Sequence, residues 1–270
     1  MLKLNHNLVY SFKLLTVFIH GIFITALFFL VISSNYETHI YKQILEATDI
    51  KSLSDEDKIL KIQESTYNLL EPNRLFFNGK KIVGLKSKYF RSADLQLING
   101  GSCGTFTHVL GRLLQEENFT VRIAQMKCGD HWGCHILLEV KVDGRFVVLD
   151  PLYNLSFRNN DGNLASFNDV KNNFAYYSGQ LPENYGDFKF EDVRYTNWNK
   201  IPLVMPLIKV GLDYFYGSEA DYISVRSYAL NAYKIYFNIL LTLWILFIIS
   251  TFLIAQRLKS QSSLKIKSLT

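Results

Sequence analysis

Two long apolar segments constrain the fold of this chain more than any other feature of its sequence. Residues 14–33 contain no acidic or basic side chain apart from His20, and residues 235–255 contain no charged side chain. Because a helix of about 20 residues crosses the roughly 30 Å hydrocarbon core of a bilayer, both segments are long enough to span one. The sequence therefore predicts transmembrane helices over 14–33 and 235–256.

The first apolar segment has a second interpretation as a secretory signal peptide, because Lys3 and Lys13 precede it. We favour an uncleaved helix for two reasons. The apolar run is longer than a typical signal-peptide core, and Ser33 and Ser34 do not form the small-residue pattern at which signal peptides are cleaved. His20 is either a functional group within the membrane or a tolerated residue that faces another helix, and we favour the second.

Basic residues at the two ends of the chain predict its orientation. Lys3 and Lys13 precede the first apolar segment, and four basic residues follow the second: Arg257, Lys259, Lys265 and Lys267. Neither end contains an acidic residue. Because cytoplasmic flanks are enriched in Lys and Arg, both tails, 1–13 and 257–270, are expected in the cytoplasm. We therefore expect a two-pass protein of the cell membrane that contacts the lipid bilayer directly.

The net charge of +5 arises from these ends and not from the region between the spans. Residues 34–233 carry 22 Lys and Arg against 24 Asp and Glu. Nucleic-acid-binding domains present clustered positive charge, so nucleic acid is not an expected partner. A region of about 200 residues can bury one hydrophobic core. We therefore expect a single extracytoplasmic domain over 34–234.

Within this region, Cys103 begins an amphipathic segment. Apolar residues recur at the spacing of one helix face: Phe106, Val109, Leu110, Leu113 and Leu114. The pattern predicts a helix that starts at Cys103 and ends near Asn118. A helix N-terminus stabilises negative charge, so it lowers the pKa of a thiol and offers N–H donors to an oxyanion. Cys103 is therefore a candidate nucleophile.

Three strands are expected after this helix, over residues 121–126, 135–142 and 145–149. Asp143-Gly144 is a strong signal for a two-residue hairpin turn between the last two. Counting back from that turn places Leu137 opposite Asp150, with His135 as the diagonal neighbour of Asp150. Such diagonals lie about 7–8 Å apart between Cα atoms, which allows a hydrogen bond between His135 and Asp150.

Together these motifs resemble the core of the transglutaminase-like superfamily. The matching stretches are Gly-Ser-Cys-Gly-Thr-Phe, Val-Arg-Ile, Cys-His-Ile-Leu-Leu-Glu-Val and Arg-Phe-Val-Val-Leu-Asp-Pro, within residues 93–155. The resemblance implies an α+β, papain-like core in which a cysteine at a helix N-terminus packs on an antiparallel sheet. It also implies a triad of Cys103 as nucleophile, His135 as general base and acid, and Asp150 as orienting carboxylate. Aliphatic residues follow His135 where the family commonly has an aromatic residue.

The expected chemistry is acyl transfer through a thioester. The thiolate of Cys103 would attack an amide or ester carbonyl of a protein, a peptide or an envelope polymer. The acyl group would then pass to an amine, as in crosslinking, or to water, as in proteolysis or deamidation. The reaction needs no cofactor and no metal ion. The alternative is a membrane-tethered binding module on the same fold, in which each triad residue is only structural: a small core residue, a strand histidine and a turn aspartate.

Cys128 and Cys134 flank the short connection between two expected strands. A disulfide across it is the first expectation in an oxidising compartment, and two free thiols are the second. The third is the zinc site of a hydrolase, formed within the cluster of Cys128, Asp130, His131, Cys134 and His135, whose spacing matches no paired zinc pattern. His131 also competes with His135 as the base, but is expected in the turn.

An oxyanion would be stabilised first by the main-chain N–H of Cys103. The side chain of Gln96, seven residues before the cysteine, is a second candidate.

The remaining segments predict further structure around this core. Residues 36–70 predict polar helices that end at a break over 71–73. Their expected packing positions are Leu45, Leu53, Ile59, Leu60, Ile62, Leu69 and Leu70. Residues 166–169 resemble a capping box that opens a helix through Asn172. The aromatic-rich residues 182–198 either form the floor of a substrate cleft or pack a loop-rich lobe.

Residues 201–217 are strongly apolar but contain Pro202 and Pro206. They are too short and too interrupted for a third span. We therefore expect this segment either to be buried in the domain or to lie on the membrane surface.

Overall fold

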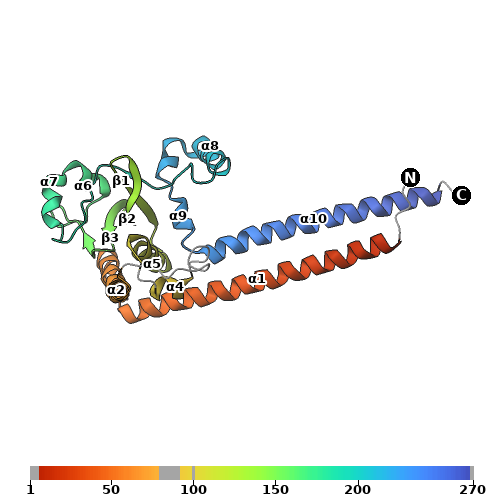
Figure 1. Ribbon diagram of the computed structural model, residues 1–270, viewed down its shortest axis with the longest axis horizontal. Helices are drawn as coiled ribbons and strands as arrows, with labels where there is room; N and C mark the ends of the chain where they lie inside the picture. Colours follow the sequence, from red (N-terminus) through yellow and green to blue (C-terminus); the bar gives the residue numbers. More distant parts are fainter. Residues whose placement is uncertain (1–5, 79–91, 99–100, 268–270) are drawn as a thin grey trace. The chain divides into compact units, whose positions relative to one another are not determined.

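The computed structural model describes residues 6–78, 92–98 and 101–267. The chain divides into two compact units, one formed by residues 1–36 with 233–270 and the other by residues 37–232. The first unit contains most of α1 (His6–Thr48) and of α10 (Ala232–Lys267). The second contains the last part of α1 and all the strands (Figure 1).

The two long helices match the predicted apolar segments. By length and composition, Tyr10–Thr48 and Ala232–Arg257 are each long and apolar enough to cross a membrane, with mean hydropathies of 2.5 and 2.4 over their most apolar stretches. Within this unit the indole N–H of Trp244 donates to Nδ1 of His20 at 2.9 Å. His20 therefore faces the other helix, as we favoured.

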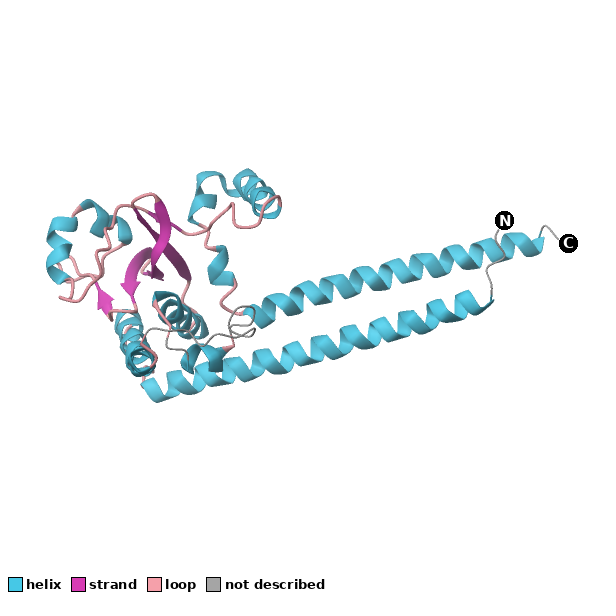
Figure 2. Ribbon diagram, viewed as in Figure 1, coloured by secondary structure: helices cyan, strands magenta, loops and turns pink. Residues whose placement is uncertain are grey.

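The second unit is α+β, with a five-stranded antiparallel sheet (Figure 2). Its strands are β1 (Val121–Cys128), β2 (His131–Val142), β3 (Arg145–Asp150), β4 (Leu155–Ser156) and β5 (Val193–Arg194), in the order β4-β3-β2-β1-β5. Val142 pairs with Arg145, as the turn signal predicted. The turn residues Asp143 and Gly144 have φ of 48° and 83°, a conformation that glycine adopts without steric cost.

Helices cover one face of this sheet. The helices of the second unit are α2 (Asp55–Phe76), α4 (Ala93–Ile98), α5 (Cys103–Glu116), α6 (Phe167–Asn172), α7 (Phe174–Tyr177), α8 (Val204–Tyr216) and α9 (Val225–Tyr228), with 3₁₀ turns η1 (Ser178–Gln180) and η2 (Gly217–Tyr222). Of these, α2, α4 and α5 contribute to the core on the first face. All five predicted core residues of α5 are fully buried. They pack with Leu138 and Val140 of the sheet, with α2, and with the last part of α1 (Figure 1).

Three sequence predictions about α1 and α2 are corrected. The helix expected to end at residue 33 continues to Thr48, because residues 34–48 contain no Gly or Pro and Tyr41 is fully buried in the core. The break expected over 71–73 is absent, and α2 includes Pro72. Contacts on both sides of Pro72 maintain this turn of the helix: Leu70 is fully buried, and the Asn73 amide donates to the Leu97 carbonyl at 2.8 Å. Among the expected packing positions, Leu69 is exposed.

The other face of the sheet packs against a loop-rich lobe. Leu137 and Val148 from the sheet contact aromatic residues of this lobe, including Phe157 and Phe190. The predicted capping box is present, since the Ser166 hydroxyl accepts from the main-chain N–H of residue 169 and the Asp169 carboxylate accepts from that of Ser166.

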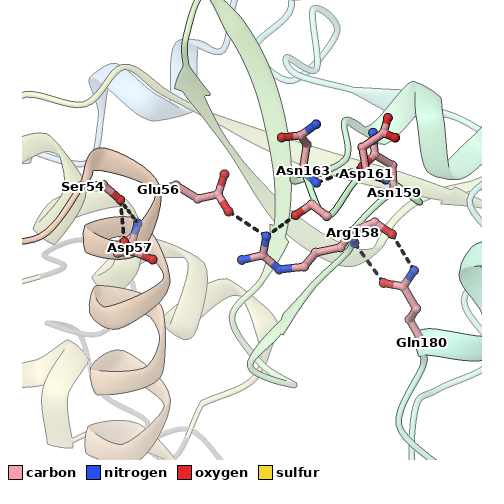
Figure 3. A network of polar contacts seen from close by, with 9 residues as sticks. Ser54, Glu56, Asp57, Arg158, Asn159, Asp161, Asn163 and Gln180 are labelled. Atoms are coloured by element: carbon pink, nitrogen blue, oxygen red, sulfur yellow. Dashed lines mark hydrogen bonds and ion pairs between the residues drawn. The ribbon is translucent and has the colours of Figure 1, made fainter.

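Arg158 connects the loop-rich lobe to α2 (Figure 3). Its guanidinium contacts the Glu56 carboxylate at 2.7 Å and donates to the carbonyl of Gly162. Its own main-chain carbonyl accepts from the Gln180 amide at 2.7 Å, and its N–H donates to the same side chain at 2.9 Å. Both the backbone and the side chain of Arg158 therefore anchor the loop after β4.

The segment expected to be buried or surface-bound forms α8. Only Met205 of this helix is buried. Burial in the domain is therefore wrong for most of α8, because the domain covers Met205 and leaves most of the other large apolar residues of the helix exposed.

Candidate active site

Cys103 is the first residue of α5, as the apolar spacing predicted. Ser102 precedes it in an extended conformation. A Cβ on Gly101 would lie 2.0 Å from Oγ1 of Thr105 and 2.9 Å from its Cβ, so the first turn of the helix requires glycine there. The hydroxyl of Thr107 donates to the carbonyl of Ile136 at 3.0 Å. This bond holds the start of α5 against β2.

A β-bulge in β2 contains the candidate base. Gln125 pairs with Ile136 and Lys127 pairs with Trp132, so the single residue between them on β1 is opposed by residues 133–135 of β2. Such bulges redirect side chains and are common near active sites. His135 is the last bulged residue, and only 1% of it is exposed.

His135 and Asp150 meet as the hairpin register predicted. Nε2 of His135 lies 2.6 Å from Oδ2 of Asp150. The carboxylate is fully buried and accepts two further bonds, from the Tyr185 hydroxyl at 2.9 Å and from the Leu152 N–H at 3.2 Å. A buried carboxylate is costly unless such donors surround it. Three donors therefore compensate for the burial of the Asp150 carboxyl group and fix its position beside the imidazole.

The His135 imidazole also interacts with the Cys103 thiol, and this interaction acts on the pKa of both groups. Since Asp150 occupies Nε2, the nitrogen available to the thiol is Nδ1. Cys103 is partly exposed and is the free cysteine of the described chain. The three predicted residues are therefore brought together in one site, in the order thiol, imidazole and carboxylate.

The electrostatics of this chain favour a charged pair. Burial opposes ionisation of the Cys103 thiol, but the hydrogen bond and the positive charge of His135 outweigh it and lower the thiol pKa. Burial also lowers the pKa of His135, yet its bonds to Asp150 and Cys103 raise that pKa to about 9. A low thiol pKa next to a high imidazole pKa favours thiolate and imidazolium at neutral pH.

Two aromatic residues complete the site, and sequence reasoning did not single out their roles. The ring of Phe188 stacks on His135, with centroids 4.2 Å apart and planes 13° apart. Tyr185 lies edge-on to His135 at 6.2 Å, and burial and the charge of Asp150 raise its pKa above its usual range. Tyr185 is therefore a donor to Asp150 at neutral pH. The aromatic-rich composition of 182–198 was the available signal, and it did not indicate which ring contacts His135.

The tip of the β1–β2 hairpin differs from the prediction. The strands continue to Cys128 and from His131, which leaves a two-residue turn. His131 therefore lies on a strand and not in the turn, exposed and opposite Cys128. Cys128 and Cys134 form a disulfide with Cα atoms 6.2 Å apart. That disulfide uses the two sulfur ligands that a zinc site there would need.

Gln96, the second oxyanion candidate, is buried in α4. This short helix packs near α5, and residues 99–100, between Gln96 and Cys103, lie outside the described residues. Within the described ranges, no group of three or more His, Cys, Asp or Glu side chains is arranged to hold a metal ion.

Comparison of the chain with protein-family models, with curated proteins and with solved structures finds no match. The interpretation of the site therefore depends on its own geometry.

Proposed function

We propose that this protein is a membrane-anchored cysteine acyl-transfer enzyme of the transglutaminase-like type, with a papain-like core. Cys103 is the nucleophile, His135 the general base and acid, and Asp150 the orienting carboxylate. One observation carries the proposal: a partly exposed thiol at a helix N-terminus interacts with a buried imidazole, which is bound in turn to a buried carboxylate. This combination activates a nucleophile and serves no obvious packing purpose.

The reaction begins when the Cys103 thiolate forms a bond to the carbonyl carbon of an amide or ester. The carbonyl electron pair moves to oxygen, and N–H groups at the start of α5, first that of Cys103, stabilise the oxyanion. The carbon–nitrogen or carbon–oxygen bond then breaks, and His135 gives its proton to the leaving group. A thioester on Cys103 remains.

The second half-reaction releases the acyl group. An amine or water attacks the thioester, His135 takes the proton of the attacking group, and the carbon–sulfur bond breaks to restore the thiolate. Transfer to an amine gives transamidation, and transfer to water gives hydrolysis. The substrate class is a protein, a peptide or an envelope polymer.

Membrane anchoring is part of this proposal. Two helices long and apolar enough to span a bilayer support a two-pass arrangement. The excess of Lys and Arg in the tails supports a cytoplasmic location for both ends. The disulfide supports an oxidising location for residues 37–232, outside the cytoplasm.

The first test is the pH dependence of iodoacetamide alkylation at Cys103 in detergent-solubilised protein. Wild type should label well below the free-thiol pKa of about 8.5, and His135→Ala should shift the profile toward that value. His131→Ala is the matched control, because His131 is an exposed histidine of the same strand. An ordinary thiol profile in the wild type, unaffected by His135→Ala, would overturn the proposal.

A binding module on the same fold is the second candidate. It is favoured by the burial of His135, which is 1% exposed and stacked against Phe188. An activated Cys103 that never transfers an acyl group from peptide substrates to water or to a primary amine would support the module. Incorporation of a fluorescent amine, or peptide cleavage lost in Cys103→Ala, would support the enzyme.

A further inference from the structure

Helix α8 exposes more large apolar side chains than a helix covered by its own domain. Large apolar residues of α8 and the residue before it are between 42% and 84% exposed, among them Leu203, Leu207, Val210, Tyr214 and Phe215. Met205 is the buried residue of the helix. Contiguous apolar surface of this kind marks an interaction site.

Lys209 connects α8 to the rest of the second unit. The Lys209 ammonium contacts Asp213 on the same helix and Asp221 of η2, the latter at 3.0 Å. The same ammonium lies 5.8 Å from the centre of the Trp198 ring. These contacts fix the polar side of α8 against η2 and leave its apolar side uncharged.

We infer that α8 is an interfacial helix that lies in the headgroup region of the bilayer with its apolar side toward the hydrocarbon. A helix of 13 residues is about 20 Å long, too short to cross a core of roughly 30 Å. An apolar helix that cannot span lies in the plane of the interface. Tyr214, Phe215 and Tyr216 suit that depth, because aromatic rings concentrate at membrane interfaces.

We assign the bilayer as the partner of the apolar side of α8 because a helix of the same chain that is able to span a membrane follows α8 closely. Residues 217–231 connect α8 directly to α10, one of the two helices that are long and apolar enough to span. Tethering raises the local concentration of the binding surface, so α8 needs little intrinsic affinity. Its paired charges give no electrostatic attraction to anionic lipids. The inference uses the proposed membrane anchoring and is independent of acyl transfer.

Depth-dependent fluorescence quenching of the full-length protein tests this inference. In a Cys103→Ser background, single cysteines at Leu207, Asp161 and Leu246 are labelled with a nitrobenzoxadiazole dye, and the protein is reconstituted in phosphatidylcholine vesicles. Asp161 is an exposed control in the second unit, and Leu246 is an exposed position of α10. Lipids with a spin label near the headgroup or deep in the acyl chain serve as quenchers.

The dye at residue 207 should be quenched several-fold more than the dye at 161, and more strongly by the shallow spin label than by the deep one. The dye at 246 should respond most to the deep label. Replacing part of the phosphatidylcholine by an anionic lipid should leave the quenching at 207 unchanged.

Equal quenching at 207 and 161, with strong quenching at 246, overturns the inference and leaves membrane anchoring intact. A blue-shifted but unquenched dye at 207 overturns it in favour of a protein partner or a second copy. Loss of quenching at 246 overturns the anchoring proposal and this inference together.

Discussion

At the scale of single residues, the site depends on how a buried carboxylate is satisfied. Asp150 accepts bonds from an imidazole, a phenol and a main-chain N–H, all from different positions along the chain. Only one of these donors, His135, contacts the candidate nucleophile. The other two hold the carboxylate in place, so they act on the nucleophile only through His135.

Tyr185→Phe removes one of these donors and keeps the ring. A hydrogen bond to a charged group contributes roughly 1.5–3 kcal/mol, so the thermal midpoint of unfolding should fall by several degrees. Tyr176→Phe is the control, because its hydroxyl makes one exposed bond of 3.4 Å to a carbonyl. Equal midpoints for the two variants in scanning fluorimetry would show that the Tyr185–Asp150 bond contributes no stability.

Cys103→Ala should add a pH dependence of stability that the opposed contributions of His135 and Cys103 cancel in the wild type. The folded-state pKa of His135 is raised to about 9, so its stabilisation is complete below its unfolded pKa of about 6.5 and is lost as pH rises toward 9. The lowered pKa of Cys103 acts oppositely: its stabilisation is present above the unfolded thiol pKa and is lost as pH falls through the folded value. Between the unfolded pKa of His135 and the unfolded pKa of Cys103, the folded pair holds one proton on His135 and the unfolded pair holds one on Cys103. The two states therefore bind equal numbers of protons in this range.

The measurement is the thermal midpoint between pH 6.5 and pH 9. Without the thiol, the Asp150 carboxylate still raises the pKa of His135, so the midpoint of Cys103→Ala should fall with pH relative to the wild type. Parallel curves for the two proteins would contradict a thiolate–imidazolium pair in the folded state.

At the scale of elements, the bulged hairpin determines where His135 lies. Cys134 immediately precedes His135, and its disulfide to Cys128 closes the hairpin beyond the bulge. The register on the other side of the bulge is set by the pairing of Gln125 with Ile136. His135 is therefore held between a covalent link and a hydrogen-bonded ladder.

Cys128→Ser with Cys134→Ser should loosen this element without unfolding the sheet. A disulfide that closes so short a loop contributes about 2 kcal/mol, and the ladder from Val121 to Gln125 remains. Faster amide exchange is expected over 129–135, with slower alkylation of Cys103 at pH 7. Reducing agent should produce the same change in the wild type and none in the double variant. Unchanged alkylation in the double variant would show that the ladder alone positions His135.

Local sequence signals predicted α5 and the β2–β3 hairpin, because apolar spacing and the Asp143-Gly144 turn specify them without distant contacts. The two-residue strands β4 and β5 were not predicted, since two residues carry no periodic pattern. The bulge was missed for another reason: a register shift depends on the partner strand. Cys103, His135 and Asp150 were accessible to sequence reasoning because helix start and hairpin register place them. Tyr185 and Phe188 were not, because only the folded path of their loop brings them to His135.

At the scale of the whole molecule, the two apolar helices and the disulfide make a joint prediction about sidedness. A disulfide persists in an oxidising compartment, and Lys and Arg accumulate on the cytoplasmic side. Both rules favour the same proposed orientation, because the disulfide lies between the two apolar helices in the sequence and the basic excess lies in the tails. Two independent rules in agreement make the orientation testable with a single reagent.

A membrane-impermeant maleimide applied to intact cells should label Cys103, because its partly exposed thiol would face outward. In Cys103→Ala, the same reagent should label nothing before or after permeabilisation, because the two remaining cysteines form the disulfide. A cysteine introduced at Ser268 in that background should react only after permeabilisation, since the tail 257–270 is expected in the cytoplasm. Labelling of the Ser268 position in intact cells, with Cys103 protected, would reverse the orientation. The disulfide would then lie in a reducing compartment, where it should be found open by mass spectrometry of alkylated Cys128 and Cys134.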